Sequence, residues 1–157
     1  MNDIDAPLPP DDLGHRVSEV FDLVGALYRR GLRKLEQSEK DEGVSVGVRS
    51  VLVLLRRYGP MTVPQMARLM ALTRQFVQRM VNDAVAEGWA EVTPNPAHQR
   101  SSLIRITSAG EVLIDAILAR EHAVNRQVGG GLTEAELTAC RRVLKEMLRT
   151  FDEVDVD

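Results

Sequence analysis

Five side chains that can read DNA bases are concentrated in the stretch TRQFVQRMVN, which runs from Thr73 to Asn82. Arginine can donate two hydrogen bonds to guanine, and glutamine or asparagine can pair with the edge of adenine. All three residue types also hold phosphate groups. At about 100° per residue, the five share one face of a helix: Arg74, Gln75, Gln78, Arg79 and Asn82. The opposite face is apolar and is predicted to lie in the core: Phe76, Val77, Met80, Val81 and Ala84.

The composition of this region favours a nucleic-acid partner. An ordinary solvated helix face mixes glutamate with lysine, because such pairs support the helix and keep the surface soluble. Between Gly43 and Asn82 the chain has no acid and six arginines: Arg49, Arg56, Arg57, Arg68, Arg74 and Arg79. Thr73 would begin the helix, whose first N–H groups can hold a phosphate. We therefore count Thr73 and Arg68 among the candidate DNA contacts; a solvated face that lacks acids by chance is the alternative.

The net charge of −3 hides three segments of opposite sign. Residues 1–42 carry ten acids and six bases, residues 43–110 three acids and eight bases, and residues 111–157 ten acids and six bases. Because phosphate neutralisation dominates DNA binding, only the middle segment is predicted to face a polyanion.

Two helices are predicted to precede the basic stretch. Residues 1–12, rich in proline and aspartate, are expected to form a flexible tail, with Asp12 capping a long first helix over residues 13–42. This helix is predicted to end at the polar KDEG stretch. A second helix is predicted from Ser45 to Tyr58, ended by a Gly-Pro pair.

A helix-turn-helix is predicted next. Thr62 and Gln65 have the spacing of a capping box for a short third helix, and Thr73 would cap the fourth. Only a tight turn fits between Met70 and Thr73. This spacing is typical of a helix-turn-helix, whose second helix enters the DNA major groove.

A hairpin is predicted to follow, with strands at residues 89–92 and 103–107. The loop between them carries His98 and Arg100 and no acid. A cationic tip of this kind can enter a minor groove, where the potential is most negative over A·T-rich sequence. Helix-turn-helix and hairpin together indicate a winged helix.

Two further helices are predicted after the hairpin. Thr107 would cap the fifth, which the triple glycine at residues 129–131 would break. Thr133 and Glu136 form a second capping box for the last helix.

The order of elements and three local strings resemble the MarR family of winged-helix transcription regulators. TRQFVQRMVNDAVAEG is similar to that family's recognition helix, HQRSSLIRITSAGE to its wing, and GLTEAELTACRRVLKEML to its closing helix. The resemblance covers about residues 13 to 150. It implies a homodimer with intertwined first, fifth and sixth helices, and often a repressor released by a small, frequently aromatic, ligand. It places Thr73, Arg74, Gln75, Gln78 and Arg79 in the major groove and Arg100 in the minor groove.

The wing departs from the family pattern at one position. Family members commonly have an acid two residues before the wing arginine, and this chain has His98 there. As a hypothesis, protonating His98 would strengthen DNA binding below its pKa, which for an unperturbed histidine is about 6.5.

The predicted fold class is mainly α. A winged helix-turn-helix with a two-stranded hairpin wing would occupy residues 43–107, and long N- and C-terminal dimerisation helices would occupy residues 13–42 and 108–157. The outer helices are apolar over more length than the central unit can cover, which independently favours a dimer. Two recognition helices predict a pseudo-palindromic double-stranded DNA operator.

Several function classes are disfavoured. The histidines lie on three different predicted elements without metal-ligand spacing, and no glycine-rich phosphate loop follows a strand, so neither an enzyme, a metal site nor a cofactor is expected. The longest apolar run, VLVLL, is too short for a membrane span. A single cysteine fits a reducing compartment, and we expect a cytoplasmic protein.

Two alternative functions stay open. Cys140, next to two arginines, could act as a redox sensor, although packing in a dimer interface is favoured. The chain could also be a winged-helix interaction module without DNA binding, which salt dependence would distinguish. The effector site is unknown: Met66, Met70, Trp89 and Tyr28 could line a crevice, but such a set is more often core.

Overall fold

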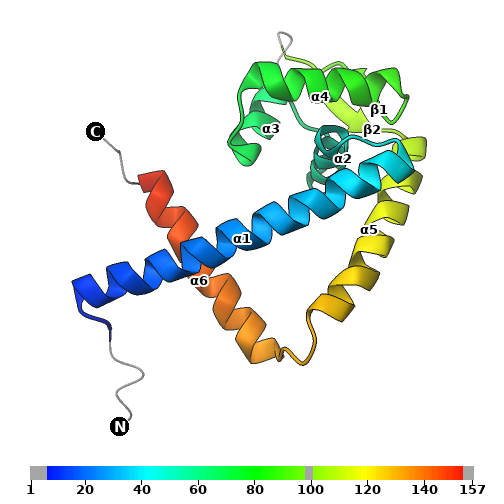
Figure 1. Ribbon diagram of the computed structural model, residues 1–157. Coiled ribbons are helices and arrows are strands. Elements are labelled where there is room, and N and C mark those ends of the chain that lie inside the picture. Colours follow the sequence, from blue (N-terminus) through cyan, green and yellow to red (C-terminus); the bar gives the residue numbers. More distant parts are fainter. Residues whose placement is uncertain (1–6, 98–100, 154–157) are drawn as a thin grey trace. The chain divides into compact units, whose positions relative to one another are not determined.

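A computed structural model describes residues 7–97 and 101–153, without the side chains of residues 35, 36, 38–42, 152 and 153. Over these residues the fold is mainly helical with one antiparallel hairpin, so the predicted fold class is confirmed (Figure 1). The elements are α1 (Pro10–Glu42), α2 (Val46–Tyr58), α3 (Val63–Met70), α4 (Arg74–Ala86), β1 (Ala90–Thr93), β2 (Leu103–Ile106), α5 (Ser108–Val128) and α6 (Glu134–Glu153). The chain divides into two compact units, Met1–Ile114 and Asp115–Asp157.

Local hydrogen bonds set the starts of α2 and α3 where the sequence predicts them. The Ser45 hydroxyl accepts a hydrogen bond from the Val48 amide at 3.2 Å, which begins α2. In the capping box, the Thr62 amide donates to Oε1 of Gln65 at 2.8 Å, and the Gln65 amide donates to Oγ1 of Thr62 at 3.4 Å. Ala71 has a φ of 52°, which makes the tight turn between α3 and α4. The helix-turn-helix thus follows from short-range hydrogen bonding.

The core of the first unit lies among α2, α3 and α4, with α4 in contact with both α2 and α3. Its fully buried side chains include Leu52 and Leu55 from α2, Met66 from α3, and Val77 and Val81 from α4. Burial of Val77, Val81 and Ala84 confirms most of the predicted apolar face of α4. Because that face is anchored in the core, the opposite side of α4 is held outward.

The hairpin pairs β1 with β2 in antiparallel register, with Val92 opposite Ile104. Met61, just before α3, adds a bridge to Ile104: each amide donates to the other carbonyl, at 3.0 and 2.8 Å. β1 begins at Ala90, one residue later than predicted, because the Trp89 amide still donates to the carbonyl of Ala84 in α4. The Met61 bridge ties the wing to the helix-turn-helix.

The start of α5 is locked against the beginning of the hairpin. The Thr107 hydroxyl accepts from the Gly110 amide at 3.1 Å, as predicted for a cap, and donates to the Gly88 carbonyl at 2.7 Å. Gly110 approaches so closely that a Cβ there would lie 2.1 Å from the Trp89 carbonyl oxygen. Glycine is therefore required at residue 110 for this packing.

Helix α1 begins earlier than the sequence predicts and ends at the predicted residue. It begins at Pro10, two residues before the predicted Asp12 cap, and ends at Glu42, within the KDEG stretch. Proline suits the first turn because its missing N–H would have no helical partner. Asp11 and Asp12 lie in that turn, where the helix dipole favours acids. Gly43, with a φ of 69°, follows the last helical residue.

In the second unit, α6 begins with the predicted capping box. The Thr133 amide donates to Glu136 Oε2 at 2.8 Å, and the Glu136 amide donates to Thr133 Oγ1 at 3.3 Å. The backbone hydrogen bond from Thr133, together with that from its hydroxyl, holds the pKa of Glu136 below its usual value. Gly130, with a φ of 51°, lies in the turn between α5 and α6.

Candidate nucleic-acid interface

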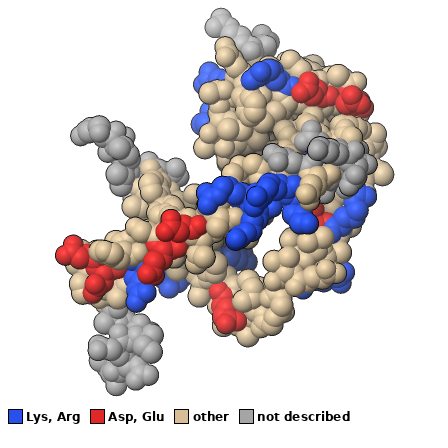
Figure 2. Space-filling model, in the orientation of Figure 1, with Lys and Arg blue, Asp and Glu red and all other residues tan. Residues whose placement is uncertain are grey.

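The predicted base-reading side chains of α4 are all exposed: Arg74, Gln75, Gln78, Arg79 and Asn82. Among the residues that the structure describes, neither Arg74 nor Arg79 forms an ion pair with a carboxylate. Figure 2 shows basic side chains over the first part of α4 and acidic ones over its end. The guanidinium groups of this face are thus available to a polyanion.

A hydrogen bond organises the middle of this face. Nε2 of Gln78 donates to Oδ1 of Asn82 at 2.9 Å, one helical turn away. No other hydrogen bond within the described part of the chain uses the Gln78 carbonyl oxygen or its second amide hydrogen, and an amide oxygen and an amide N–H are the kinds of group that pair with adenine. Asn82 therefore orients Gln78 as well as being a candidate contact itself.

Phe76 departs from its predicted place in the core. Its side chain is 42% exposed, although the sequence pattern assigns it to the apolar face. The Cζ of Arg79 lies 5.3 Å from the centroid of the Phe76 ring, in a cation–π arrangement. On a helical wheel Phe76 lies at the margin of the apolar face, about 60° from Arg79. That marginal position is a sequence signal of partial exposure, but the rotation of α4 against the core decides how much of the ring is exposed.

Thr73 and Arg68 flank the face at its start. Thr73 caps α4, and its hydroxyl oxygen accepts from the Phe76 amide at 3.3 Å. The hydroxyl hydrogen can still be donated to a phosphate oxygen. Arg68 is exposed in the last turn of α3, just before the turn into α4. Both positions suit phosphate contacts rather than base reading.

The wing is described only up to its tip. Nδ2 of Asn95 donates to Oγ of Ser101 at 3.2 Å across the base of the loop. Arg105 on β2 donates to the Glu91 carboxylate on β1 at 2.9 Å, so this arginine is paired within the hairpin. The predicted wing contacts His98 and Arg100 lie outside the described residues.

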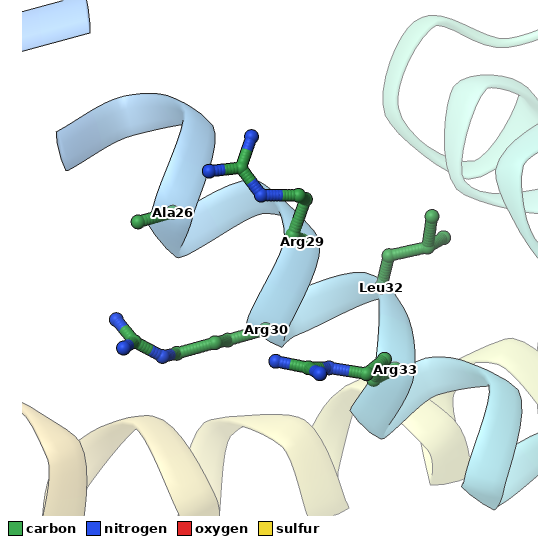
Figure 3. A pocket seen from close by; sticks show the side chains of 5 residues that line it. All are labelled: Ala26, Arg29, Arg30, Leu32 and Arg33. Atoms are coloured by element: carbon green, nitrogen blue, oxygen red, sulfur yellow. The ribbon is translucent and has the colours of Figure 1, made fainter. Parts of the chain in front are cut away.

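A second basic cluster, which the sequence analysis did not single out, lies on α1. Arg29, Arg30 and Arg33 line a hollow of about 430 Å³, together with Ala26 and Leu32 (Figure 3). Gly25 leaves room for the Arg29 side chain, since a Cβ at residue 25 would lie 3.2 Å from Nη1 of Arg29. Figure 2 shows basic side chains gathered along the second half of α1 and acidic ones along its first half.

The residues weighed for other functions are scattered. Met66 is fully buried in the core and Tyr28 is 66% exposed on α1, so for Met66 the core interpretation is confirmed. Cys140 is exposed on α6. In the described part of the chain, no three His, Cys, Asp or Glu residues are grouped so that they could hold a metal ion. None of the described helices is long and apolar enough to cross a membrane.

Comparisons with known proteins agree with this geometry. The model of the MarR family matches residues 42–101. The uncharacterized protein Rv2011c of Mycobacterium tuberculosis is 36% identical over 138 residues, covering 88% of this chain and 93% of that protein. The MarR family transcription regulator SP03579, known from a crystal structure, is 30% identical in sequence, and its structure matches with a TM-score of 0.73. The match covers 90% of this chain and 96% of SP03579.

A more distant structure shares the fold. BpsR of Bordetella bronchiseptica, whose DNA binding is regulated by 6-hydroxynicotinic acid, is 23% identical, with a TM-score of 0.68. The match covers 82% of this chain and 98% of that one. MarR family members are transcription regulators rather than enzymes. With a helix-turn-helix, a hairpin wing and these relatives, the chain belongs to the MarR family of winged-helix transcription regulators.

Proposed function

We propose that this protein is a homodimeric, sequence-specific DNA-binding repressor that a small molecule releases from its operator. The observation that carries the proposal is the exposed face of α4, whose arginines have no carboxylate partner among the described residues. Arg74 and Arg79 would contact guanines, and Gln75, Gln78 and Asn82 would contact adenines. Because the apolar side of α4 is anchored in the core, these side chains are presented on a rigid element.

Backbone contacts would fix the position of α4 on the duplex. Thr73 and Arg68 would hold phosphates on either side of the turn between α3 and α4. Arg100 would enter the adjacent minor groove at the tip of the wing, with His98 beside it in place of the acid common in the family. The Met61 bridge to Ile104 supports this arrangement, because it ties the wing to the helix-turn-helix.

Exposed apolar side chains on the outer helices support a homodimer. Large hydrophobic residues that are more than half exposed occur on α1, α5 and α6: Leu23, Leu27, Tyr28, Val112, Val124, Val128, Leu148 and Phe151. Apolar surface of this extent on a single chain marks an interaction site. In a twofold dimer the two copies of α4 would read half-sites about one helical turn of DNA apart, so the operator would be pseudo-palindromic.

Release by a small molecule is the part of the proposal that rests on relatives. DNA binding by BpsR responds to 6-hydroxynicotinic acid, and the two proteins share their fold. A ligand of this protein would act by binding one conformation of the dimer more tightly than the other. Because 6-hydroxynicotinic acid is a small aromatic acid, compounds of this class are the first to screen for release of the protein from DNA.

Selection of bound DNA from a random library tests the proposal. The purified full chain should enrich one pseudo-palindromic sequence, and the complex should have the mass of two chains and one duplex. A reporter gene placed behind the enriched sequence should be silenced when the protein is expressed. Enrichment of no sequence, or binding that does not weaken as salt is raised, would favour a winged-helix interaction module instead.

A further inference from the structure

We propose that Phe76 is a specificity-determining residue that reads the methyl group of a thymine in the major groove. The inference rests on the proposed function, since it requires α4 to lie in that groove. Thymine is the base that presents a C5-methyl group there, and phenylalanine is one of the side chains that contacts it. The face of α4 would then read all three kinds of group that a major groove offers: donors, acceptors and methyl groups.

Phe76 is the most exposed residue of the apolar side of α4. Val77, Val81 and Ala84 are at most 1% exposed and Met80 is partly buried, whereas Phe76 is 42% exposed. A phenylalanine that served only the core would gain by burying its whole ring, because each buried CH2 group is favourable. Its ring instead lies at the edge of the polar face, in the first turn of the helix. In a helix-turn-helix the N-terminal residues of this helix contact the base edges.

The cation–π contact between Arg79 and the ring links the methyl contact to guanine recognition. The guanidinium carbon lies 5.3 Å from the ring centroid, so the two side chains lie together on the surface. A guanidinium held over an aromatic ring is pre-organised and loses less rotamer freedom when it binds. Phe76 and Arg79 should therefore read neighbouring bases, a thymine and a guanine, as a pair.

Replacing thymine by uracil tests the contact directly, since uracil keeps every hydrogen-bonding group and lacks the methyl. In the operator enriched by the wild-type protein, each thymine would be replaced in turn by deoxyuridine, and affinity would be measured by fluorescence anisotropy. In each half-site, replacing one particular thymine is expected to weaken wild-type binding roughly three- to fivefold, the effect of losing one buried methyl group. Phe76→Ala should bind the thymine and deoxyuridine operators equally.

The end of α2 offers a matched control. Tyr58 is 55% exposed and has Arg57 over its ring at 5.8 Å, the same kind of pair on a different helix. Tyr58→Ala should respond to deoxyuridine as the wild type does, and Phe76→Leu, which keeps an apolar side chain, should retain part of the response. Thermal unfolding of each variant would show whether it is folded.

Two results would overturn the proposal while leaving DNA binding intact. Either the wild-type protein is insensitive to deoxyuridine at every thymine of its operator, or Phe76→Ala responds as strongly as the wild type. A wild-type chain that enriches no DNA at all would instead overturn the proposed function, and with it this inference.

Discussion

Gln78 and Asn82 are joined by a hydrogen bond of 2.9 Å, in which the amide of Gln78 donates to the side-chain oxygen of Asn82. The bond restricts the rotation of an exposed, flexible glutamine and fixes which of its atoms face outward. Pre-organising a base-reading amide in this way reduces the entropy lost on binding.

We therefore expect Asn82→Ala to weaken discrimination at the base that Gln78 reads. The difference in binding free energy between the operator and the variant changed at that base pair should fall by ~0.5–1.5 kcal/mol, the usual net value of one hydrogen bond. A double-mutant cycle with Gln78→Ala, measured on the operator and on a variant changed at that base pair, should give non-additive effects. Gln75→Ala, on the same face but outside this hydrogen bond, serves as the control. Strictly additive losses for Gln78 and Asn82 would show that they act independently.

Gly110→Ala should destabilise the first unit. The added Cβ would lie 2.1 Å from the Trp89 carbonyl oxygen and 2.9 Å from Cγ1 of Ile106, and a main-chain carbonyl cannot move aside without disturbing the hairpin. A cost of ~1–3 kcal/mol, typical of overpacking, is expected in urea unfolding. Gly14→Ala in α1, whose new Cβ would meet no described atom within 4 Å beyond the neighbouring backbone of its own helix, should instead stabilise that helix by ~0.5–1 kcal/mol. Equal effects of the two substitutions would contradict the close packing at Gly110.

The capping box of α6 should show a pH dependence of defined sign. Because hydrogen bonds from Thr133 lower the pKa of Glu136 in the folded state, their contribution to stability is present above the unfolded pKa, about 4.3 for glutamate. That contribution is lost as the pH falls through the lower, folded pKa. Carbon-detected NMR should find the Glu136 pKa depressed in the wild type. Thr133→Ala removes the hydroxyl hydrogen bond but keeps the backbone amide, which is the larger cause, so the pKa should rise only part of the way toward its ordinary value. A titration unaffected by the substitution would show that the Thr133 hydroxyl does not lower this pKa.

The histidine in the wing gives a second pH dependence, this time in binding. Protonated His98 would add a positive charge beside Arg100 in the minor groove, so affinity at fixed salt should rise as the pH is lowered from 8 to 5.5. His98→Gln should abolish the rise. Affinity that stays flat over this range in the wild type would show that His98 does not contact the DNA electrostatically.

Short-range features of the fold could be predicted from the sequence because they depend on neighbouring residues. The capping boxes at Thr62 and Thr133 and the cap at Thr73 are found where predicted, since each needs only a polar side chain within three residues of free amides. The exposed polar face of α4 follows equally from helical periodicity.

Features that depend on distant parts of the chain could not be predicted in this way. The bridge between Met61 and Ile104 joins residues on opposite sides of the helix-turn-helix, and no local pattern indicates it. The exposure of Phe76 depends on how α4 is rotated about its axis against its neighbours in the core. Helical periodicity fixes that rotation only to within the width of the apolar face. The α1 arginines are adjacent in sequence, but the hollow beside Ala26 depends on their side-chain conformations.

The most direct test of the central claim, that the exposed face of α4 is the DNA interface, is the affinity of arginine variants for the selected operator and for random DNA. Arg74→Ala and Arg79→Ala should each weaken operator binding by ~1–3 kcal/mol, with smaller losses on random DNA, if they make bidentate base contacts. Arg126→Ala, an exposed arginine on α5, is the matched control and should bind like the wild type. If all three variants bind the operator as tightly as the wild-type protein, α4 does not face the DNA and the claim is wrong.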